Sequence, residues 1–166
     1  MNTYLELIAF SLIIGIGATL VMDIYAVILK RFFNIPSLDF RIVGRWIGHF
    51  KAGVFFHKNI LQAETVRYER AIGWLAHYLI GISFAFLLLL IWGREWAYHP
   101  TFGPAISIGL LTTIAPFFLM QPAFGFGIAA SKTPNPNLAR FRSLKAHAIY
   151  GIGLYVTALL LSIVLS

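Results

Sequence analysis

The 166-residue chain contains no cysteine and has few charged residues of either sign. The absence of cysteine excludes disulfides, iron–sulfur clusters, thiolate metal sites and thiol redox chemistry. Charged residues make up 11% of the chain, against about 25% in ordinary globular proteins. Common catalytic motifs are also missing: the sequence has no Gly-rich phosphate loop, no HExxH, no nucleophile elbow and no paired carboxylates. The sequence therefore gives no support for an enzyme.

Hydrophobic residues make up 59% of the chain. A soluble fold of this size has too little interior to bury so much apolar surface, whereas a lipid bilayer offers an apolar solvent. No ten-residue segments alternate apolar with polar residues, which excludes a membrane β-barrel. We therefore expect an all-α, polytopic protein with residues 1–166 forming a single integral membrane domain in contact with the lipid bilayer.

Four segments are long and apolar enough to cross a membrane, which takes about 20 residues each. They cover residues 4–29, 71–92, 104–130 and 144–165. The first has no basic start of the kind found in signal peptides, so we expect it to be retained as a transmembrane helix. The third contains Pro116 and Pro122, followed by Gly125 and Gly127. Such helix breaks are tolerated beside protein or a water-filled cavity, so this span contains either a simple kink or part of a transport path.

Basic residues are distributed very unevenly between the connections. Of the 13 Lys and Arg residues, only Arg94 lies in the loop between the second and third spans, and the others lie in, or at the span ends next to, the two connections on the opposite side. The positive-inside rule places both of those connections in the cytoplasm and both termini in the periplasm of a bacterial inner membrane. Because the net charge of +7 comes from residues that flank the spans, it indicates membrane orientation, and we expect no nucleic-acid partner.

The first cytoplasmic connection is predicted to contain an interfacial amphipathic helix over about residues 38–50. After a cap at Ser37, apolar residues recur at helical spacing, while Arg41, Arg45 and His49 share another side. Such a helix either rests on the lipid surface or covers a site as a lid. In the second case Arg45 and His49 are the candidate gate or interface residues.

Spans two and four contain similar strings with a small residue, a histidine and a glycine at four-residue steps. Gly73-Trp-Leu-Ala-His77-Tyr-Leu-Ile-Gly81-Ile can be laid over Ser143-Leu-Lys-Ala-His147-Ala-Ile-Tyr-Gly151-Ile without gaps. The match suggests a duplicated two-helix hairpin. Small residues let helices approach closely in lipid, so we expect helix packing at Gly15, Gly73, Gly81 and Gly151.

Each of the four spans has one polar side chain in its cytoplasmic half. Asp23 lies seven residues before Lys30, and His77 lies seven residues after Arg70, so both are about 10 Å deep from the same side. His147 and Gln121 lie at similar levels in the last two spans, and Thr19 is a further candidate in the first. A buried ionisable group in lipid is costly and should face protein and be paired, so this cluster is the candidate site.

Several functions remain open for the cluster. It can bind or translocate a small solute, proton or ion, and a transport path built from four spans would need a homodimer or a membrane partner. Alternatively the protein is a non-transporting scaffold or partner subunit whose cluster only fixes packing. Asp23, His77 and His147 could bind a divalent metal, although their spacing is not typical of metal ligands. In a third alternative, His77 and His147 are the axial ligands of one haem.

The sequence also resembles a family of small bacterial inner-membrane proteins described as a domain of unknown function. The resemblance covers nearly the whole chain and implies a bacterial inner-membrane location and four helices, but it supplies no activity, ligand or catalytic residues. It rests on Gly15-Ile-Gly17-Ala-Thr19-Leu-Val-Met-Asp23, Gly44-Arg-Trp-Ile-Gly48-His49, Glu69-Arg-Ala-Ile-Gly-Trp-Leu-Ala-His77-Tyr, Met120-Gln-Pro-Ala-Phe-Gly-Phe-Gly-Ile-Ala-Ala-Ser131-Lys-Thr-Pro-Asn-Pro136 and Arg142-Ser-Leu-Lys-Ala-His147.

Overall fold

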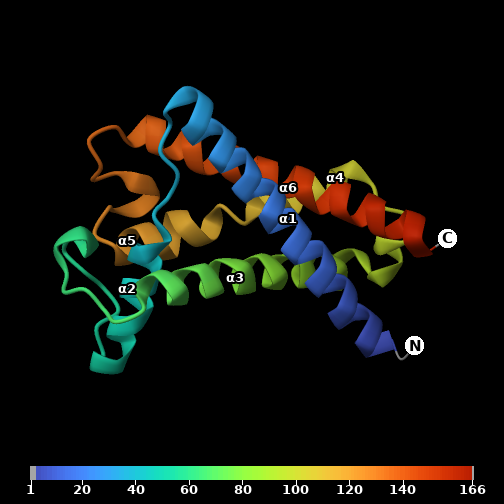
Figure 1. Ribbon diagram of the computed structural model, residues 1–166, viewed down its shortest axis with the longest axis horizontal. Coiled ribbons are helices and arrows are strands. Elements are labelled where there is room, and N and C mark those ends of the chain that lie inside the picture. Colours follow the sequence, from blue (N-terminus) through green and yellow to red (C-terminus); the bar gives the residue numbers. More distant parts are fainter. Residues whose placement is uncertain (1–2, 166) are drawn as a thin grey trace. The chain divides into compact units, whose positions relative to one another are not determined.

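The computed structural model describes residues 3–165, and all regular structure in this range is helical (Figure 1). The all-α prediction is therefore confirmed. The α-helices are α1 (Thr3–Phe33), α2 (Phe40–His49), α3 (Glu69–Trp92), α4 (Phe102–Leu111), α5 (Gln121–Ala123) and α6 (Pro136–Leu165). Short helices lie between them: the 3-10 turns η1 (Phe50–Ala52), η2 (Ile60–Gln62), η3 (Arg94–Ala97) and η5 (Ile128–Ala130), and the π-helix η4 (Pro116–Met120).

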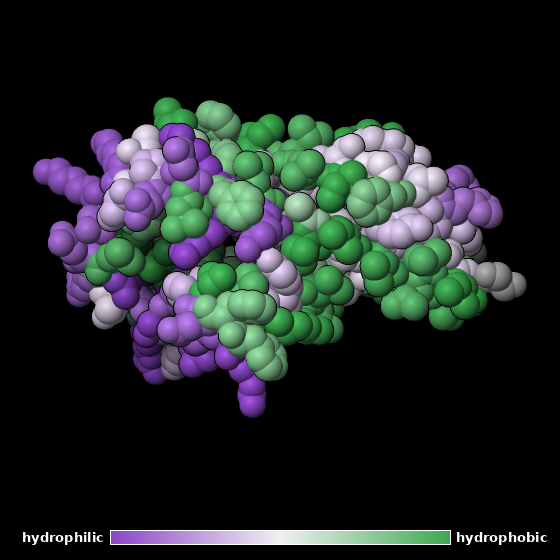
Figure 2. Space-filling model, turned by 90° about the horizontal axis from the view of Figure 1, so that it is seen from above, coloured by the Kyte–Doolittle hydropathy of each residue, from purple (hydrophilic) through white to green (hydrophobic). Residues whose placement is uncertain are grey.

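Four helical segments are long and apolar enough to cross a membrane, as predicted. These spans are Thr3–Phe33, Glu69–Trp92, Phe102–Ala123 and Pro136–Leu165. Only 22–28% of the most apolar window of each span is buried by protein, and hydrophobic residues cover much of the surface visible in Figure 2. Exposed leucine, isoleucine and valine side chains along whole helices are unfavourable in water and favourable in lipid.

The chain forms two compact units. Unit 1 contains residues 1–37, 78–112 and 146–166, and unit 2 contains residues 38–77 and 113–145. Each unit has its own hydrophobic core. In unit 1 the core includes Ile14, Leu88 and Leu154, which come from α1, α3 and α6.

The start of α1, the loop after α3 and the end of α6 lie at the same end of unit 1 (Figure 1). Arg94 of that loop forms an ion pair with Glu6 in α1. Tyr98 and Ser162 line one cavity. An even number of membrane crossings between the ends of the chain would produce this arrangement.

Close backbone contacts at small residues hold the helices of unit 1 together. A Cβ atom at Gly15 in α1 would lie 2.5 Å from the Cα atom of Ile82 in α3. A Cβ atom at Gly109 in α4 would lie 2.6 Å from the Cα atom of Gly151 in α6. At Gly81, a Cβ atom would overlap the hydroxyl of Thr19. These approaches are closer than any residue larger than glycine allows, which is how helices pack in lipid.

In unit 2, α2 packs its apolar side against protein. Ile42 and Val43 are buried with Ile60, Ala123 and Phe124 in the core of this unit. Gly44 of α2 and Gly73 of α3 lie so close to the opposite helix that neither has room for a Cβ atom. The predicted amphipathic helix is present, although its buried side rests on this core.

The cap of α2 differs from the sequence expectation. Asp39, and not Ser37, accepts a hydrogen bond from the peptide N–H of Arg41 at 3.0 Å. Residues 34–39 have no regular structure and Asp39 is extended, so the helix begins at Phe40. The Arg41 guanidinium lowers the pKa of the Asp39 carboxyl by a side-chain hydrogen bond.

The third span is interrupted and shorter than expected. After α4, a turn at Thr112 and Thr113 leads into the π-helix η4, which begins at Pro116. Proline has no N–H to donate and its ring crowds the preceding turn, which accounts for the break. The helix then ends at Ala123 and not near Ala130, because Gly125 and Gly127 adopt positive φ angles of 85° and 75° that turn the chain back.

Candidate functional site

Asp23 in α1 is the only acidic residue well inside a membrane span. The Tyr78 hydroxyl of α3 donates a hydrogen bond to Asp23 Oδ2 at 3.0 Å, and the pair is partly buried within unit 1. A hydroxyl that donates to a carboxylate lowers the cost of keeping that carboxylate charged in an apolar setting. Asp23 is therefore held by a neighbouring span inside unit 1.

A second polar pair connects the other two spans of unit 1. Thr112 Oγ1, at the end of α4, lies 2.8 Å from Nδ1 of His147 in α6. The same hydroxyl donates to the carbonyl of Gly109 at 2.6 Å, so it accepts a hydrogen bond from the Nδ1–H of His147. This hydrogen bond fixes the orientation of the His147 ring and favours the tautomer with its proton on Nδ1.

Thr19 of α1 is another predicted candidate, and its hydroxyl forms a hydrogen bond within its own helix. It donates to the carbonyl of Gly15 at 2.7 Å and is buried to 1% exposure. The contact with Gly81 described above makes this hydroxyl part of the packing between α1 and α3. In this structure Thr19 is a packing residue.

The remaining two candidates lie in unit 2. His77 stacks on Phe40 of α2, with ring centroids 4.0 Å apart, and its edge meets Trp74 at 5.8 Å. Gln121 donates from Nε2 to Ser143 Oγ at 3.4 Å. Its Oε1 atom is buried and has no hydrogen-bond partner within residues 3–165.

The structure therefore divides the five candidates between the two units. Asp23, Thr19 and His147 belong to unit 1, whereas His77 and Gln121 belong to unit 2. In the described part of the chain, no group of three or more His, Asp or Glu side chains is gathered closely enough to hold a metal ion. The geometry gives no support for a metal site made of Asp23, His77 and His147.

Arg45, predicted as a gate or interface residue, is directed into unit 2. It forms two parallel hydrogen bonds with Glu69, and Nη1 also donates to the carbonyl oxygens of Ile60, Leu61 and Ala63 at 3.2–3.4 Å. The hydrogen bond to Glu69 raises the pKa of the Arg45 guanidinium, against a smaller effect of burial. These contacts fix the loop before α3 and give Arg45 a structural role.

His49, the other gate candidate, lies beside a second histidine. The ring centroids of His49 and His57 are 4.9 Å apart. His49 Nδ1 and His57 Nε2 are both buried without a hydrogen-bond partner in residues 3–165. Burial first, and the neighbouring His49 second, lower the pKa of His57. A neutral imidazole with a free ring nitrogen can still donate or accept one hydrogen bond.

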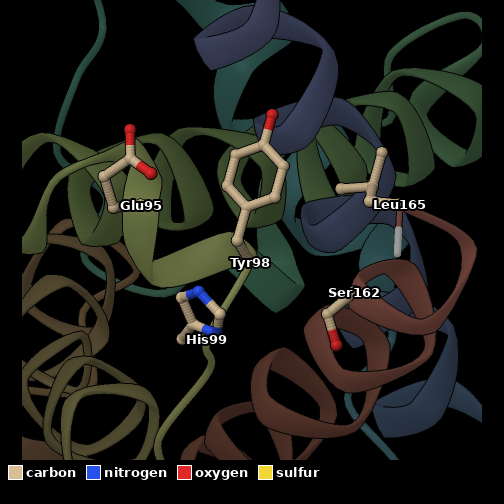
Figure 3. A pocket seen from close by; sticks show the side chains of 5 residues that line it. All are labelled: Glu95, Tyr98, His99, Ser162 and Leu165. Carbon is tan, nitrogen blue, oxygen red and sulfur yellow. The ribbon is translucent and has the colours of Figure 1, made fainter.

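A small cavity of about 260 Å³ lies at the terminal end of unit 1 (Figure 3). Glu95, Tyr98 and His99 come from the loop after α3, and Ser162 and Leu165 come from α6. The carboxylate of Glu95 pairs with Arg94 and is 72% exposed. None of the sequence-predicted candidates lines this cavity.

Sequence reasoning missed Tyr78 and Thr112, the partners of the two ionisable candidates in unit 1. Tyr78 follows directly after His77, so its position in the same helix was a usable signal. Thr112 had no such signal, because hydroxyl residues near a helix end usually bond to their own backbone.

Comparison with known proteins identifies the family but not its activity. The family model described as "Protein of unknown function (DUF2938)" matches residues 12–161. The chain therefore belongs to the DUF2938 family, as the resemblance described above implied. No match was found among curated proteins or among solved structures.

Proposed function

We propose that this DUF2938 protein is a membrane protein that binds, and moves between the two sides, a proton or a small cation at Asp23. The observation that supports it most strongly is the Tyr78–Asp23 hydrogen bond, which holds an ionisable group between two membrane spans. Charged residues at such positions are costly in lipid and commonly mark ion pathways and proton relays.

The second polar pair extends this proposal. Thr112 holds the ring of His147, and histidine changes charge near neutral pH. With Asp23, His147 gives unit 1 two titratable groups on separate spans. A proton or cation that enters one of them can be exchanged through water or through the other, and a homodimer would supply a longer path.

We propose further that the protein is oriented in a bacterial inner membrane with both termini in the periplasm. The support is the location of 12 of the 13 basic residues in the two connections on one side. The common location of both chain ends and the α3–α4 loop at one end of unit 1 agrees with this orientation (Figure 1).

The helix contacts of unit 1 favour a duplicated hairpin. Gly15 and Gly81 lie at the approach of α1 to α3, and Gly109 and Gly151 lie at the approach of α4 to α6. Gly81 and Gly151 are also the equivalent positions of the repeated strings in spans two and four. One hairpin that was copied and fused would place its close contacts at these positions.

A non-transporting scaffold is the second candidate function. It is favoured by the packing role of Thr19 and by Tyr150, whose hydroxyl donates to the carbonyl of Gly81 at 2.6 Å. Polar groups used in this way fix the register of helices in lipid. In that case Asp23 and Tyr78 form a structural clasp and bind nothing.

The two functions are separated by how the thermal stability of purified protein depends on ions. A proton or cation that binds the folded protein stabilises it increasingly as its concentration rises above the dissociation constant. Unfolding midpoints are measured in a pH series and in lithium, sodium and potassium series at constant ionic strength. We expect the wild type to respond to one of these ions, and Asp23→Asn to lose that response and the matching ion flux in liposomes.

Two further variants complete the test. Tyr78→Phe keeps the carboxylate but removes its donor, so we expect a weaker response, whereas Glu95→Gln removes an exposed carboxylate outside the spans and should behave as wild type. If Asp23→Asn lowers the unfolding midpoint by the same amount under all conditions, Asp23 and Tyr78 form a structural clasp and the ion-binding proposal is wrong. The haem alternative has its own test: a Soret band in protein produced with added haem, absent from His77→Ala and His147→Ala.

A further inference from the structure

Unit 2 contains an open cavity of about 700 Å³, a size within the usual range for small-molecule sites. We name it the lysine cavity, because lysines are its only charged lining residues in the part of the chain that is described. The lining residues that matter here are His57, Lys58, Gly125, Gly127, Ser131 and Lys132.

One wall of the lysine cavity is tied firmly to the end of α5. The peptide N–H of His57 donates to the carbonyl of Ala123 at 2.8 Å, and that of Ile60 donates to Phe124 at 3.0 Å. Gly125 lies so close to the carbonyl of Lys58 that a Cβ atom would overlap it. Lys58 is therefore held at a fixed place by backbone contacts on both sides.

The opposite wall is a closed loop between α5 and α6. The peptide N–H of Lys132 donates to the carbonyl of Phe126 at 2.8 Å, which closes the loop. Arg140 Nε donates to the carbonyl of Ala129 at 2.8 Å and holds that peptide in place. These hydrogen bonds hold the backbone next to Lys132 in place, while Lys132 itself is exposed.

His57 adds a neutral donor to the lysine cavity. His57 is one of the lining residues, and its Nε2 atom is buried without a hydrogen-bond partner within residues 3–165. A buried polar atom without a partner is unfavourable, and a ligand oxygen would remove that cost. Ser131 supplies a hydroxyl from the other wall.

We infer that the lysine cavity binds a phosphate group, carried either by an anionic lipid headgroup or by a soluble phosphate compound. Two lysines can neutralise a phosphate group, whether it is a monoester with two negative charges or a lipid phosphodiester with one, and no acidic side chain among the described lining residues opposes them. Lysine is a common phosphate ligand, and the imidazole and hydroxyl add donors for the remaining oxygens. This site goes beyond the ion site at Asp23, which lies in unit 1.

The test uses full-length protein and two probes. Inorganic phosphate binding is measured by calorimetry in detergent. Lipid binding is measured by native mass spectrometry after reconstitution with phosphatidylcholine, with or without phosphatidylglycerol. The variants are the double substitution Lys58→Gln with Lys132→Gln, and Lys51→Gln as a matched control, because Lys51 is an exposed lysine of unit 2 outside the lysine cavity.

We expect the double variant to bind the probe at least about tenfold more weakly, since one charged hydrogen bond is worth that much or more. Weaker phosphate binding than in Lys51→Gln identifies a soluble phosphate compound, whereas loss of retained phosphatidylglycerol alone identifies a lipid headgroup. If the double variant and Lys51→Gln bind both probes equally, or if wild type binds neither, the inference is wrong. These outcomes do not depend on Asp23.

Discussion

Arg45 binds Glu69 through two parallel hydrogen bonds, from Nε to Oε2 at 2.8 Å and from Nη2 to Oε1 at 3.0 Å. The two side chains are only 13% and 14% exposed. Glu69 also accepts a bond from the peptide N–H of Val66 at 3.3 Å. This pair therefore connects α2, the loop after it and the first turn of α3 within unit 2.

Removing the charge of Glu69 should destabilise the protein strongly. Glu69→Gln removes the counter-ion of the Arg45 guanidinium, which is largely shielded from solvent. In comparable buried pairs this change lowers the free energy of unfolding by about 3 kcal/mol. Arg41→Gln is the control, because Arg41 pairs with Asp39 while 59% exposed, and exposed pairs contribute about 0.5 kcal/mol. The free energy of unfolding is measured by reversible unfolding in detergent. If Glu69→Gln and Arg41→Gln lower it equally, the Arg45–Glu69 pair is not a structural contact.

The contact between α2 and α3 predicts a sharp difference between two glycines. Gly44→Ala would push a methyl group into the carbonyl of Glu69, so we expect a loss of about 2 kcal/mol from overpacking. Gly103→Ala, in the first turn of α4, has open space for the methyl group and should be neutral or stabilising by about 0.5 kcal/mol. Unfolding midpoints of both variants test this, and a tolerated Gly44→Ala would mean that the helices are further apart.

The lowered pKa of His57 predicts a loss of stability in acid. Burial first, and the neighbouring His49 second, hold this pKa below its ordinary value of 6.5. The unfolded chain therefore binds more protons between the two pKa values. The stabilisation is complete above about pH 6.5 and is lost as the pH falls toward the folded pKa, by at most about 1.4 kcal/mol per pH unit.

The variant His57→Asn should show a flatter decline in acid than wild type when unfolding free energies are compared at several pH values. His99→Asn is the matched control, because His99 lies in the exposed loop between α3 and α4. A wild-type decline that is unchanged in His57→Asn would assign the acid sensitivity to other groups.

The orientation can be tested with unusual clarity because the chain has no cysteine of its own. Lys51→Cys and His99→Cys each introduce one exposed thiol. The first lies in the connection between α1 and α3, which we propose is cytoplasmic, and the second lies in the α3–α4 loop. We expect a membrane-impermeant maleimide to label His99→Cys in intact cells whose outer membrane is permeable, and to label Lys51→Cys only after lysis. The opposite pattern would reverse the proposed topology.

The four spans could be predicted because a run of about 20 apolar residues is stable mainly as a membrane-spanning helix. The end of the third span was placed about seven residues too late, since apolar composition continues past Ala123 while Gly125 and Gly127 turn the backbone. Hydropathy does not register that change of direction, which depends on φ angles that only glycine adopts easily.

The side-chain partners were harder to predict than the helices. Asp23 accepts a hydrogen bond from Tyr78, which was not among the predicted residues although it lies next to His77 in the sequence. Arg45 was a candidate gate or interface residue, but its long side chain reaches Glu69, 24 residues later. Contacts between residues so far apart in the sequence depend on the path of the loop between them, which a single sequence does not specify.

The most direct test of the central proposal is the infrared difference spectrum of the Asp23 carboxyl group. Spectra are recorded on reconstituted wild type and on Asp23→Asn, each between two pH values and between buffers with and without the stabilising cation. The account predicts a carboxyl band that changes with proton or cation binding in wild type and is missing from Asp23→Asn. Identical difference spectra for the two proteins would contradict it.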